Sequence, residues 1–199
     1  MTVGARLFVG GRRRNTLGAL TSPPDPMDTP VLLTPEEYRR APFDGPDRDY
    51  VDGEVIERNM GELPHAILQA ELVYRLRRLG ESLGLRVLPE IRIQVAPTRF
   101  RVADVAVWLR GPIGLRIPIV PPFLVVEILS PEDRLVRLQP KIQEYLSHGV
   151  AWVWVIDADE RRAMIYSPAH PGGTLVDELR TEDPAIAIPL TDLLTALDP

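Results

Sequence analysis

Residues 123–129 read Phe-Leu-Val-Val-Glu-Ile-Leu, a run that is apolar on both faces except for one carboxylate, Glu127. Successive side chains of a strand point to opposite faces, so a run without polar alternation is typical of a central strand that is covered on both sides. Glu127 is then placed in the middle of buried surface, where an acid is costly unless it is paired or bound to a metal. The run predicts a covered sheet with a buried carboxylate.

The segments around this run predict the rest of the sheet and a helix that covers it. Three further extended segments are expected, at residues 85–95, 101–109 and 151–157. Apolar residues recur at helical spacing from Ile67 to Leu79, which predicts a helix that begins after Pro64 and ends at Gly80 or Gly84. The expected fold class is α/β or α+β, with a central mixed sheet flanked by helices and with additional antiparallel strands.

Local signals predict the smaller elements. The pair Asp52-Gly53 between two short apolar pieces indicates an antiparallel hairpin. Thr34 followed by Pro35 and two acids predicts a short helix that ends near Arg40. Residues 163–166 and 175–179 are expected to pair as strands at the edge of the sheet. Residues 191–197 are expected to form a final short helix.

Pro140 lies between two helical signals. Ser130-Pro131 and the two acids that follow predict a turn of helix. Because proline removes a backbone donor inside a helix, we expect Pro140 at the first position of a new helix, which runs to His148 and ends at Gly149. Lys141 then lies in the first turn of that helix.

The composition favours one soluble domain without thiol chemistry. The chain has 199 residues, of which 45% are hydrophobic and none is cysteine, so a sizeable core is possible and disulfides, cysteine nucleophiles and thiolate metal ligands are excluded. No apolar run approaches the roughly 20 residues of a membrane span. Arginines near the start also interrupt the apolar core that a signal peptide needs. We expect a cytoplasmic protein without a membrane partner.

Residues 1–30 differ from the rest of the chain. They combine an arginine cluster, Arg12 to Arg14, with a proline-rich run at residues 23–26, a composition that cannot bury enough apolar surface to fold alone. We expect a flexible basic tail, with a basic arm on nucleic acid and a true start at Met27 as alternatives. Residues 31–199 are expected to form one domain. The net charge of −5 argues against a nonspecific coat on DNA but not against phosphate chemistry.

Two buried acids and one lysine are the main candidates for a site. Asp104 lies in an apolar segment next to the one that carries Glu127, and two carboxylates on neighbouring strands can converge on one divalent cation. Lys141 is the single lysine beside 22 arginines, and its compact ammonium reaches sites that a guanidinium does not. Such a lysine can orient or help to deprotonate an attacking water. A purely structural ion triad is the alternative.

At these residues the chain resembles a bacterial family of restriction-endonuclease-like proteins, formerly catalogued as a domain of unknown function, within the PD-(D/E)XK nuclease superfamily. The resemblance covers roughly residues 32–197. It rests on Val51-Asp52-Gly53-Glu54, His65 at a helix start, residues 102–107 around Asp104, residues 125–131 around Glu127, Lys141 with Tyr145, Gly149-Val150, and Trp154-Val155-Ile156-Asp157.

The resemblance implies a restriction-endonuclease-like core and a metal-dependent endonuclease that hydrolyses DNA. Asp104 and Glu127 would bind Mg²⁺ or Mn²⁺, with the backbone carbonyl of Ile128 as a further ligand. Lys141 would be the catalytic lysine. RNA stays open as a substrate, and a homodimer is expected by analogy. The alternative is a noncatalytic nucleic-acid-binding or protein-interaction module on the same fold.

The sequence departs from the superfamily pattern at two positions. Ala103 stands where the superfamily usually has a proline before the aspartate, a conservative change because that proline takes no part in the chemistry. The lysine expected two residues after the glutamate is replaced by Leu129. Lys141, which lies on the following helix, would therefore supply the lysine from a different element.

Four weaker candidates accompany these residues. Glu54 matches a recurrent acid of the family and would be a third catalytic carboxylate, or only an exposed hairpin charge. His65 could contact phosphate or a metal-bound water, or only bond locally. Glu90 could face the site as a metal ligand. Tyr145, one helical turn after Lys141, could position substrate or only pack.

Overall fold

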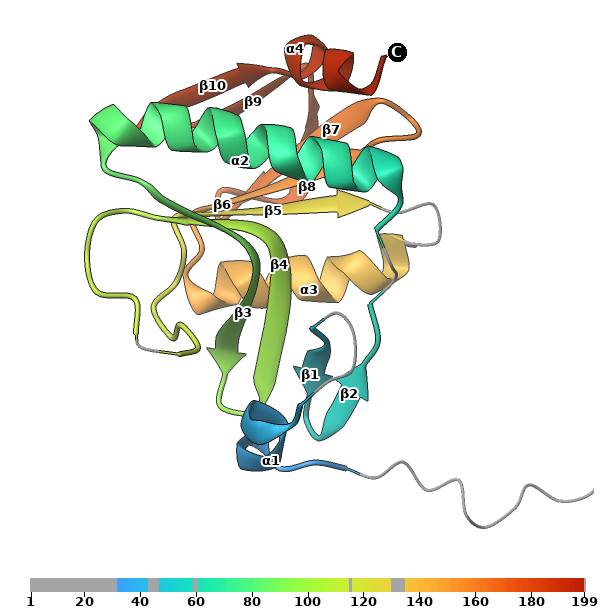
Figure 1. Ribbon diagram of the computed structural model, residues 1–199, viewed down its shortest axis with the longest axis vertical. Coiled ribbons are helices and arrows are strands. Elements are labelled where there is room, and N and C mark those ends of the chain that lie inside the picture. Colours follow the sequence, from blue (N-terminus) through green and yellow to red (C-terminus); the bar gives the residue numbers. More distant parts are fainter. Residues whose placement is uncertain (1–31, 43–46, 59–60, 115, 130–134, 199) are drawn as a thin grey trace, which may run out of the picture. The chain divides into compact units, whose positions relative to one another are not determined.

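A mixed sheet built around the apolar run at residues 123–129 organises the molecule (Figure 1). The computed structural model describes residues 32–42, 47–58, 61–114, 116–129 and 135–198. Eight described strands form the sheet, in the order β2-β1-β4-β5-β6-β7-β8, with β3 paired to β4. Their bounds are β1 Asp49–Val51, β2 Glu54–Ile56, β3 Arg86–Ala96, β4 Arg99–Trp108, β5 Leu124–Leu129, β6 Trp152–Asp157, β7 Arg162–Ser167 and β8 His170–Val176.

Strand β5 lies in the interior of this sheet, as the sequence predicts. It pairs antiparallel with β4 and parallel with β6, and the other strand pairs of the sheet are antiparallel. The parallel pair is joined by the helix α3 (Leu135–His148), which follows β5 in the chain and returns to the start of β6. The predicted central mixed sheet with flanking helices and extra antiparallel strands is confirmed.

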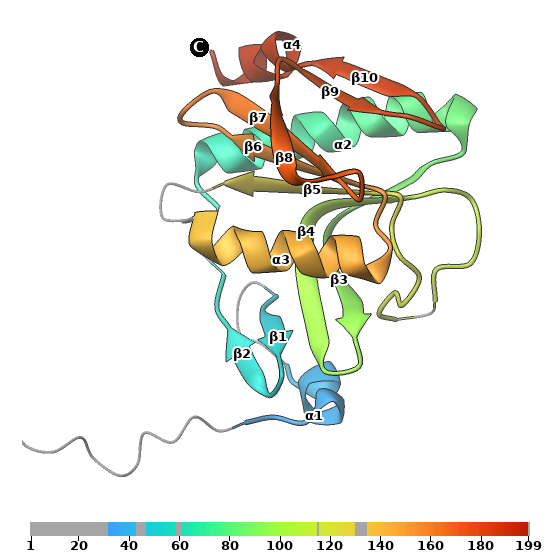
Figure 2. The same ribbon diagram turned by 180° about the vertical axis from the view of Figure 1, so that it is seen from behind.

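Two long helices cover opposite faces of β5 (Figures 1 and 2). The helix α2 (Leu63–Leu83) buries Leu68, Leu72 and Leu76 in a core that includes Val126 of β5. The helix α3 packs in a second core that includes Val125. Since Val125 and Val126 face different helices, alternation along the strand directs Glu127 to the side of α3.

The N-terminal elements match their sequence signals. The helix α1 (Pro35–Arg40) begins after Thr34, whose side chain forms a reciprocal capping box with Glu37. Asp52 and Gly53 join β1 to β2. Their φ angles are 51° and 109°, as expected because both central residues of a tight hairpin turn of this kind adopt positive φ. At its end, α2 is terminated by Gly84 in the left-handed conformation, with φ of 72°.

The structure corrects the expected start of the helix that carries Lys141. The five helical residues before Pro140 show that it does not open a new helix but lies inside α3. The buried side chains of Leu138 and Ile142 flank Pro140 and join the same core, so packing outweighs the local cost of the missing donor. The expected helical turn at residues 130–133 and the expected tail at residues 1–30 lie outside the described residues.

The C-terminal part contains a second small sheet that the sequence patterns do not predict. The expected edge pair exists as β7 and β8, but residues 177–179 do not belong to it. Leu179 lies in β9 (Glu178–Thr181), which pairs antiparallel with β10 (Ile186–Pro189). This hairpin buries Leu179 and Ile186 in the same core as the apolar side chains of α2. A short helix, α4 (Leu190–Leu194), and a 3₁₀ turn at Thr195–Leu197 follow.

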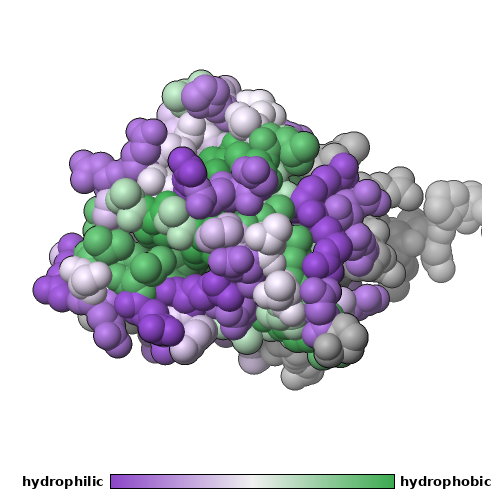
Figure 3. Space-filling model, turned by 90° about the horizontal axis from the view of Figure 1, so that it is seen from above, coloured by the Kyte–Doolittle hydropathy of each residue, from purple (hydrophilic) through white to green (hydrophobic). Residues whose placement is uncertain are grey.

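The face that carries α2 and α4 has a mixed surface. Figure 3 shows hydrophobic areas on it that are broken up by hydrophilic side chains. On α2, Tyr74, Leu79 and Leu83 expose part of their apolar surface. Within the described ranges, no helix combines the length and the apolar character that crossing a bilayer requires.

Candidate active site

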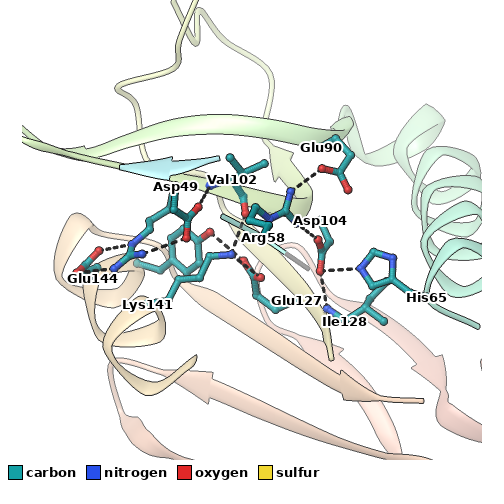
Figure 4. Close-up of polar contacts among 12 residues, drawn as sticks. Asp49, Arg58, His65, Glu90, Val102, Asp104, Glu127, Ile128, Lys141 and Glu144 are labelled. Atoms are coloured by element: carbon teal, nitrogen blue, oxygen red, sulfur yellow. Dashed lines mark hydrogen bonds and ion pairs between the residues drawn. The ribbon is translucent and has the colours of Figure 1, made fainter. Parts of the chain in front are cut away.

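The two predicted carboxylates come together through the pairing of β4 and β5. Val105 of β4 lies opposite Val126 of β5, so the next position along the ladder brings Asp104 beside Glu127 on one face of the sheet. The two residues are only 2% and 5% exposed. The strands therefore hold two acids side by side away from bulk water (Figure 4).

Asp104 accepts contacts from three different parts of the fold. Its Oδ2 accepts the backbone N–H of Ile128 at 2.7 Å and lies 3.3 Å from Nε2 of His65, at the start of α2. Its Oδ1 accepts a donor from the Arg58 guanidinium. Burial alone would raise the pKa of Asp104, but the hydrogen bond from His65 and the charges of Arg58 and Lys141 lower it. The same bond raises the pKa of His65.

Glu127 is held by two side chains of α3. Lys141 Nζ donates to Oε2 at 2.7 Å, and the Tyr145 hydroxyl donates to Oε1 at 2.9 Å. Lys141 and Tyr145 are four residues apart on a helix, so they lie on the same face. The predicted proximity of Lys141 to Glu127 is thus present in the structure, although Lys141 lies deeper in its helix than expected.

The protonation of this pair follows from burial and charge. Burial and the nearby charge of Asp104 raise the pKa of Glu127 to about 7, against the opposing effect of Lys141. Burial would lower the pKa of Lys141, but the negative charges of Glu127 and Asp49 raise it above its ordinary value. Lys141 also donates to the Val102 carbonyl at 2.8 Å. The site therefore holds a charged ammonium beside a carboxylate that ionises near neutral pH.

A second ion network anchors α3 to the sheet. Arg101 of β4 donates to Glu144 of α3 through Nε at 2.6 Å and Nη2 at 3.0 Å, and to Asp49 through Nη1 at 3.0 Å. Asp49 also accepts the backbone N–H of Val102 at 2.7 Å. Glu144 lies next to Tyr145 in the chain, so this network fixes the part of α3 that reaches Glu127.

These groups line one pocket with a volume of about 520 Å³. Asp104 and Glu127 line it, together with Arg58, His65 and Lys141. The second network contributes Asp49, Arg101 and Glu144 to the same wall. Both signs of charge therefore converge on a cavity of the size that takes a small ligand or a part of a larger one.

The remaining predicted residues lie at different distances from this pocket. His65 is buried at the pocket wall. Ile128 also lines the pocket and gives its N–H to Asp104. Glu90 is joined to the site through Arg58, whose Nη1 donates to it at 2.6 Å. Glu54 is exposed on β2 and is not among the pocket-lining residues.

Asp49, Arg58, Arg101 and Glu144 belong to the site but were not predicted as site residues. Arg101 carries a recognisable signal, because a charged residue in an apolar strand needs a partner. Glu144 precedes Tyr145 by one position, but its neighbours in the chain do not identify its partner. Asp49 and Arg58 lie near the ends of the short hairpin of β1 and β2, where the strands are too short for an alternation of polar and apolar residues to show which side chains point inward. These two residues are recognisable only from the three-dimensional contacts.

The donor set fits a divalent cation that keeps water ligands. Two carboxylates from neighbouring strands suffice for such an ion when waters or substrate phosphate complete its shell. In the described part of the chain, no group of three or more histidine, aspartate or glutamate side chains is arranged to hold a metal. Each oxygen of Asp104 and Glu127 also already accepts a protein donor. A metal would therefore share these oxygens with protein donors or replace one of the donors.

Comparison with known proteins identifies the family. The family model Uma2, described as "Putative restriction endonuclease", matches residues 35–196, which contain every residue of the pocket. The chain belongs to the Uma2 family. A search of the curated proteins gave no match. Membership in this family indicates nuclease activity, that is, a hydrolase that binds nucleic acid.

A solved structure shares the fold described above. It is the crystal structure of a protein from Anabaena variabilis, described as a putative nuclease belonging to DUF820. The two chains are 24% identical, with a TM-score of 0.72, and the match covers 83% of this Uma2 chain and 99% of the other. At this identity the likeness supports the fold alone. The predicted restriction-endonuclease-like family and fold are confirmed.

Proposed function

We propose that this Uma2 protein is an endonuclease of the PD-(D/E)XK type that hydrolyses DNA phosphodiester bonds. Asp104 and Glu127 are the proposed ligands of Mg²⁺ or Mn²⁺, and Lys141 is the proposed catalytic lysine. The observation that carries the proposal is the buried contact of the single lysine with Glu127, at 2.7 Å, beside a second carboxylate in a pocket. A homodimer belongs to the same proposal, since duplex DNA has two strands to cut. A cytoplasmic location is also part of it.

The chemistry divides between the carboxylates and the lysine. A divalent cation at Asp104 and Glu127 would supply a Lewis acid that activates water and neutralises phosphate charge. An ammonium has three donors, and the described contacts of Lys141 are with the Val102 carbonyl and Glu127. The remaining proton can orient the attacking water or stabilise charge that develops on the phosphate.

Residues in and behind the pocket wall orient this set. The Ile128 N–H and His65 fix the Asp104 carboxylate, and the Tyr145 hydroxyl fixes Glu127. The Arg101 network holds α3 against β4. Rigid placement of reacting groups contributes to rate because little reorganisation is needed as the reaction proceeds.

A noncatalytic nucleic-acid-binding or protein-interaction module is the second candidate. It is favoured by the protein donors on each oxygen of Asp104 and Glu127, which offset the charge of the acids without a metal. The two candidates differ in metal binding. The nuclease must bind Mg²⁺ or Mn²⁺ in calorimetry, whereas the noncatalytic module shows no heat of binding.

The test of the nuclease is cleavage of a substrate panel in Mg²⁺ and in Mn²⁺. The panel holds supercoiled plasmid, linear duplex, single-stranded DNA, branched DNA and RNA, so it also separates DNA from RNA as the substrate. The natural chain should cut DNA only with metal, and Asp104→Asn should not cut. The control Asp159→Asn makes the same change on an exposed turn and should cut like the natural chain. Absence of cutting together with absence of metal binding would establish the noncatalytic module.

A further inference from the structure

Arg58 places a positive charge directly at the proposed metal ligands. Its guanidinium donates through Nη2 to Asp104 and through Nη1 to Glu90, the latter at 2.6 Å. Only 16% of its side chain is exposed. Burial alone would lower the pKa of Arg58, but the charges of Asp104 and Glu90 raise it. Arg58 is therefore a permanent cation in contact with the carboxylate that a metal would need.

Arg58 differs from the other donors around the two acids in its backbone setting. The Ile128 N–H belongs to β5, His65 begins α2, and Lys141 lies in α3. Arg58 follows the end of β2 and belongs to neither a helix nor a strand. A side chain on such a segment can move without disturbing a ladder of backbone hydrogen bonds. Among the donors to Asp104, the guanidinium is the one whose residue lies outside the helices and strands.

Glu90 provides a second partner that is built into the sheet. The ladder of β3 and β4 pairs Pro89 with Val105 and Ile91 with Ala103, so Glu90 stands opposite Asp104. Its φ angle is 47°, a left-handed conformation that non-glycine residues rarely adopt. Backbone strain of this kind persists where the surroundings impose it and is frequent at functional sites.

One glutamine ties this strained position to the strand that carries Asp104. Gln69 Nε2 donates to Glu90 at 3.0 Å and to the Asp104 carbonyl at 2.9 Å. The Glu90 side chain is 44% exposed, so it lies at the rim of the site, whereas Asp104 lies inside. Arg58 thus bridges one inner and one outer carboxylate.

We propose that Arg58 occupies the cation position at Asp104 in the metal-free protein and that a divalent cation displaces it, while Glu90 keeps the guanidinium at the rim. This inference rests on the proposed function, because it takes Asp104 as a metal ligand. Arg58 is then a positioning residue that holds the empty carboxylate in place and competes with the metal. Removal of the guanidinium should therefore strengthen metal binding.

The test is calorimetric titration with Mn²⁺ of the natural chain, Arg58→Gln and Arg99→Gln. Arg99 is the matched control, because it lines the same pocket and pairs with Asp52 and Glu144 but not with Asp104. Arg58→Gln should bind Mn²⁺ about tenfold more tightly than the natural chain, since a competing charge in contact is lost. Arg99→Gln should change the affinity by less than about threefold, since its exposed charge is screened.

A second readout is the stabilisation by metal, measured as the rise in Tm between EDTA and Mn²⁺. Arg58→Gln should melt lower than the natural chain in EDTA and gain more from Mn²⁺. If Arg58→Gln does not fold in EDTA, Arg58→Lys takes its place. Lysine keeps the charge but lacks the fork that reaches both carboxylates, so it should also bind Mn²⁺ more tightly than the natural chain.

Three results would overturn the inference. Weaker or equal Mn²⁺ binding by the Arg58 variant would mean that the guanidinium supports the site and does not compete for it. Equal tightening by the Arg99 variant would assign the effect to the general field of the pocket. Both of these results leave the proposed nuclease standing. If no variant and no natural chain binds Mn²⁺, the inference and the proposed function fail together.

Discussion

The ionisation of Glu127 has a consequence for stability that can be measured without a substrate. Its pKa is about 7 in the folded protein, against 4.5 for an ordinary glutamate. A raised pKa means that the folded state holds a proton which the unfolded state has released, so stability falls as the pH rises from about 4.5 through 7. The full loss is on the order of a few kcal/mol.

Glu127→Gln should remove this part of the pH dependence, because glutamine does not ionise. We expect the unfolding free energy of the natural chain, relative to that of the variant, to decrease between pH 5 and pH 8 in metal-free buffer. Urea unfolding at both pH values measures the difference. Parallel pH curves for the two proteins would contradict a raised pKa at Glu127.

Individual residues of the site were predictable where their chemistry conflicts with their surroundings. Asp104 and Glu127 are acids inside apolar runs, and Lys141 is a lysine in a chain that otherwise uses arginine. Arg58 shows no such conflict, because an arginine in a polar connection is ordinary. Its role depends on contacts with Asp104 and Glu90 that no local pattern specifies.

At the scale of the elements, α3 contains a proline that the helix tolerates because of its packing. Pro140 has no N–H for the carbonyl of Val136, whereas Leu138 and Ile142 are buried on either side of it. The sequence signal for a break at Pro140 is therefore real but local. It is outweighed by core contacts that are distant in the chain.

Pro140→Ala should stabilise the protein, because alanine restores the backbone donor and has a higher helix propensity. We expect the unfolding free energy to increase by about 1–3 kcal/mol. Thermal unfolding with calorimetric detection checks this. Ser147→Ala, at an exposed position of the same helix, is the control and should change stability by less than about 0.5 kcal/mol. A lower stability of Pro140→Ala would mean that proline is needed to shape the helix.

Elements with strong local signals were predictable, and those fixed by tertiary contacts were not. The Asp52-Gly53 turn, the Thr34 cap and the end of α2 at Gly84 each follow from one or two residues with a defined conformation. The hairpin of β9 and β10 has strands of only four residues. Such short strands are stabilised by the core that they share with α2, so their sequence alone carries little signal.

At the scale of the whole molecule, the topology brings the site together. Lys141 follows Glu127 by 14 residues, and the crossover from β5 through α3 to β6 returns the lysine to the strand that carries the acid. The order of helices and strands was sufficient to predict a covered mixed sheet. It was not sufficient to predict the register of β4 and β5, which places Asp104 beside Glu127.

The central claim is that the contact between Lys141 and Glu127 belongs to a nuclease site and not to a structural ion pair. The most direct measurement is the rate of plasmid cleavage in Mn²⁺ by Lys141→Met, which keeps the length of the side chain and removes its charge. We predict that the cleavage rate falls by at least about a hundredfold. A cooperative unfolding transition of Lys141→Met should show that the variant is folded. Cleavage by the folded Lys141→Met at the rate of the natural chain would contradict the claim.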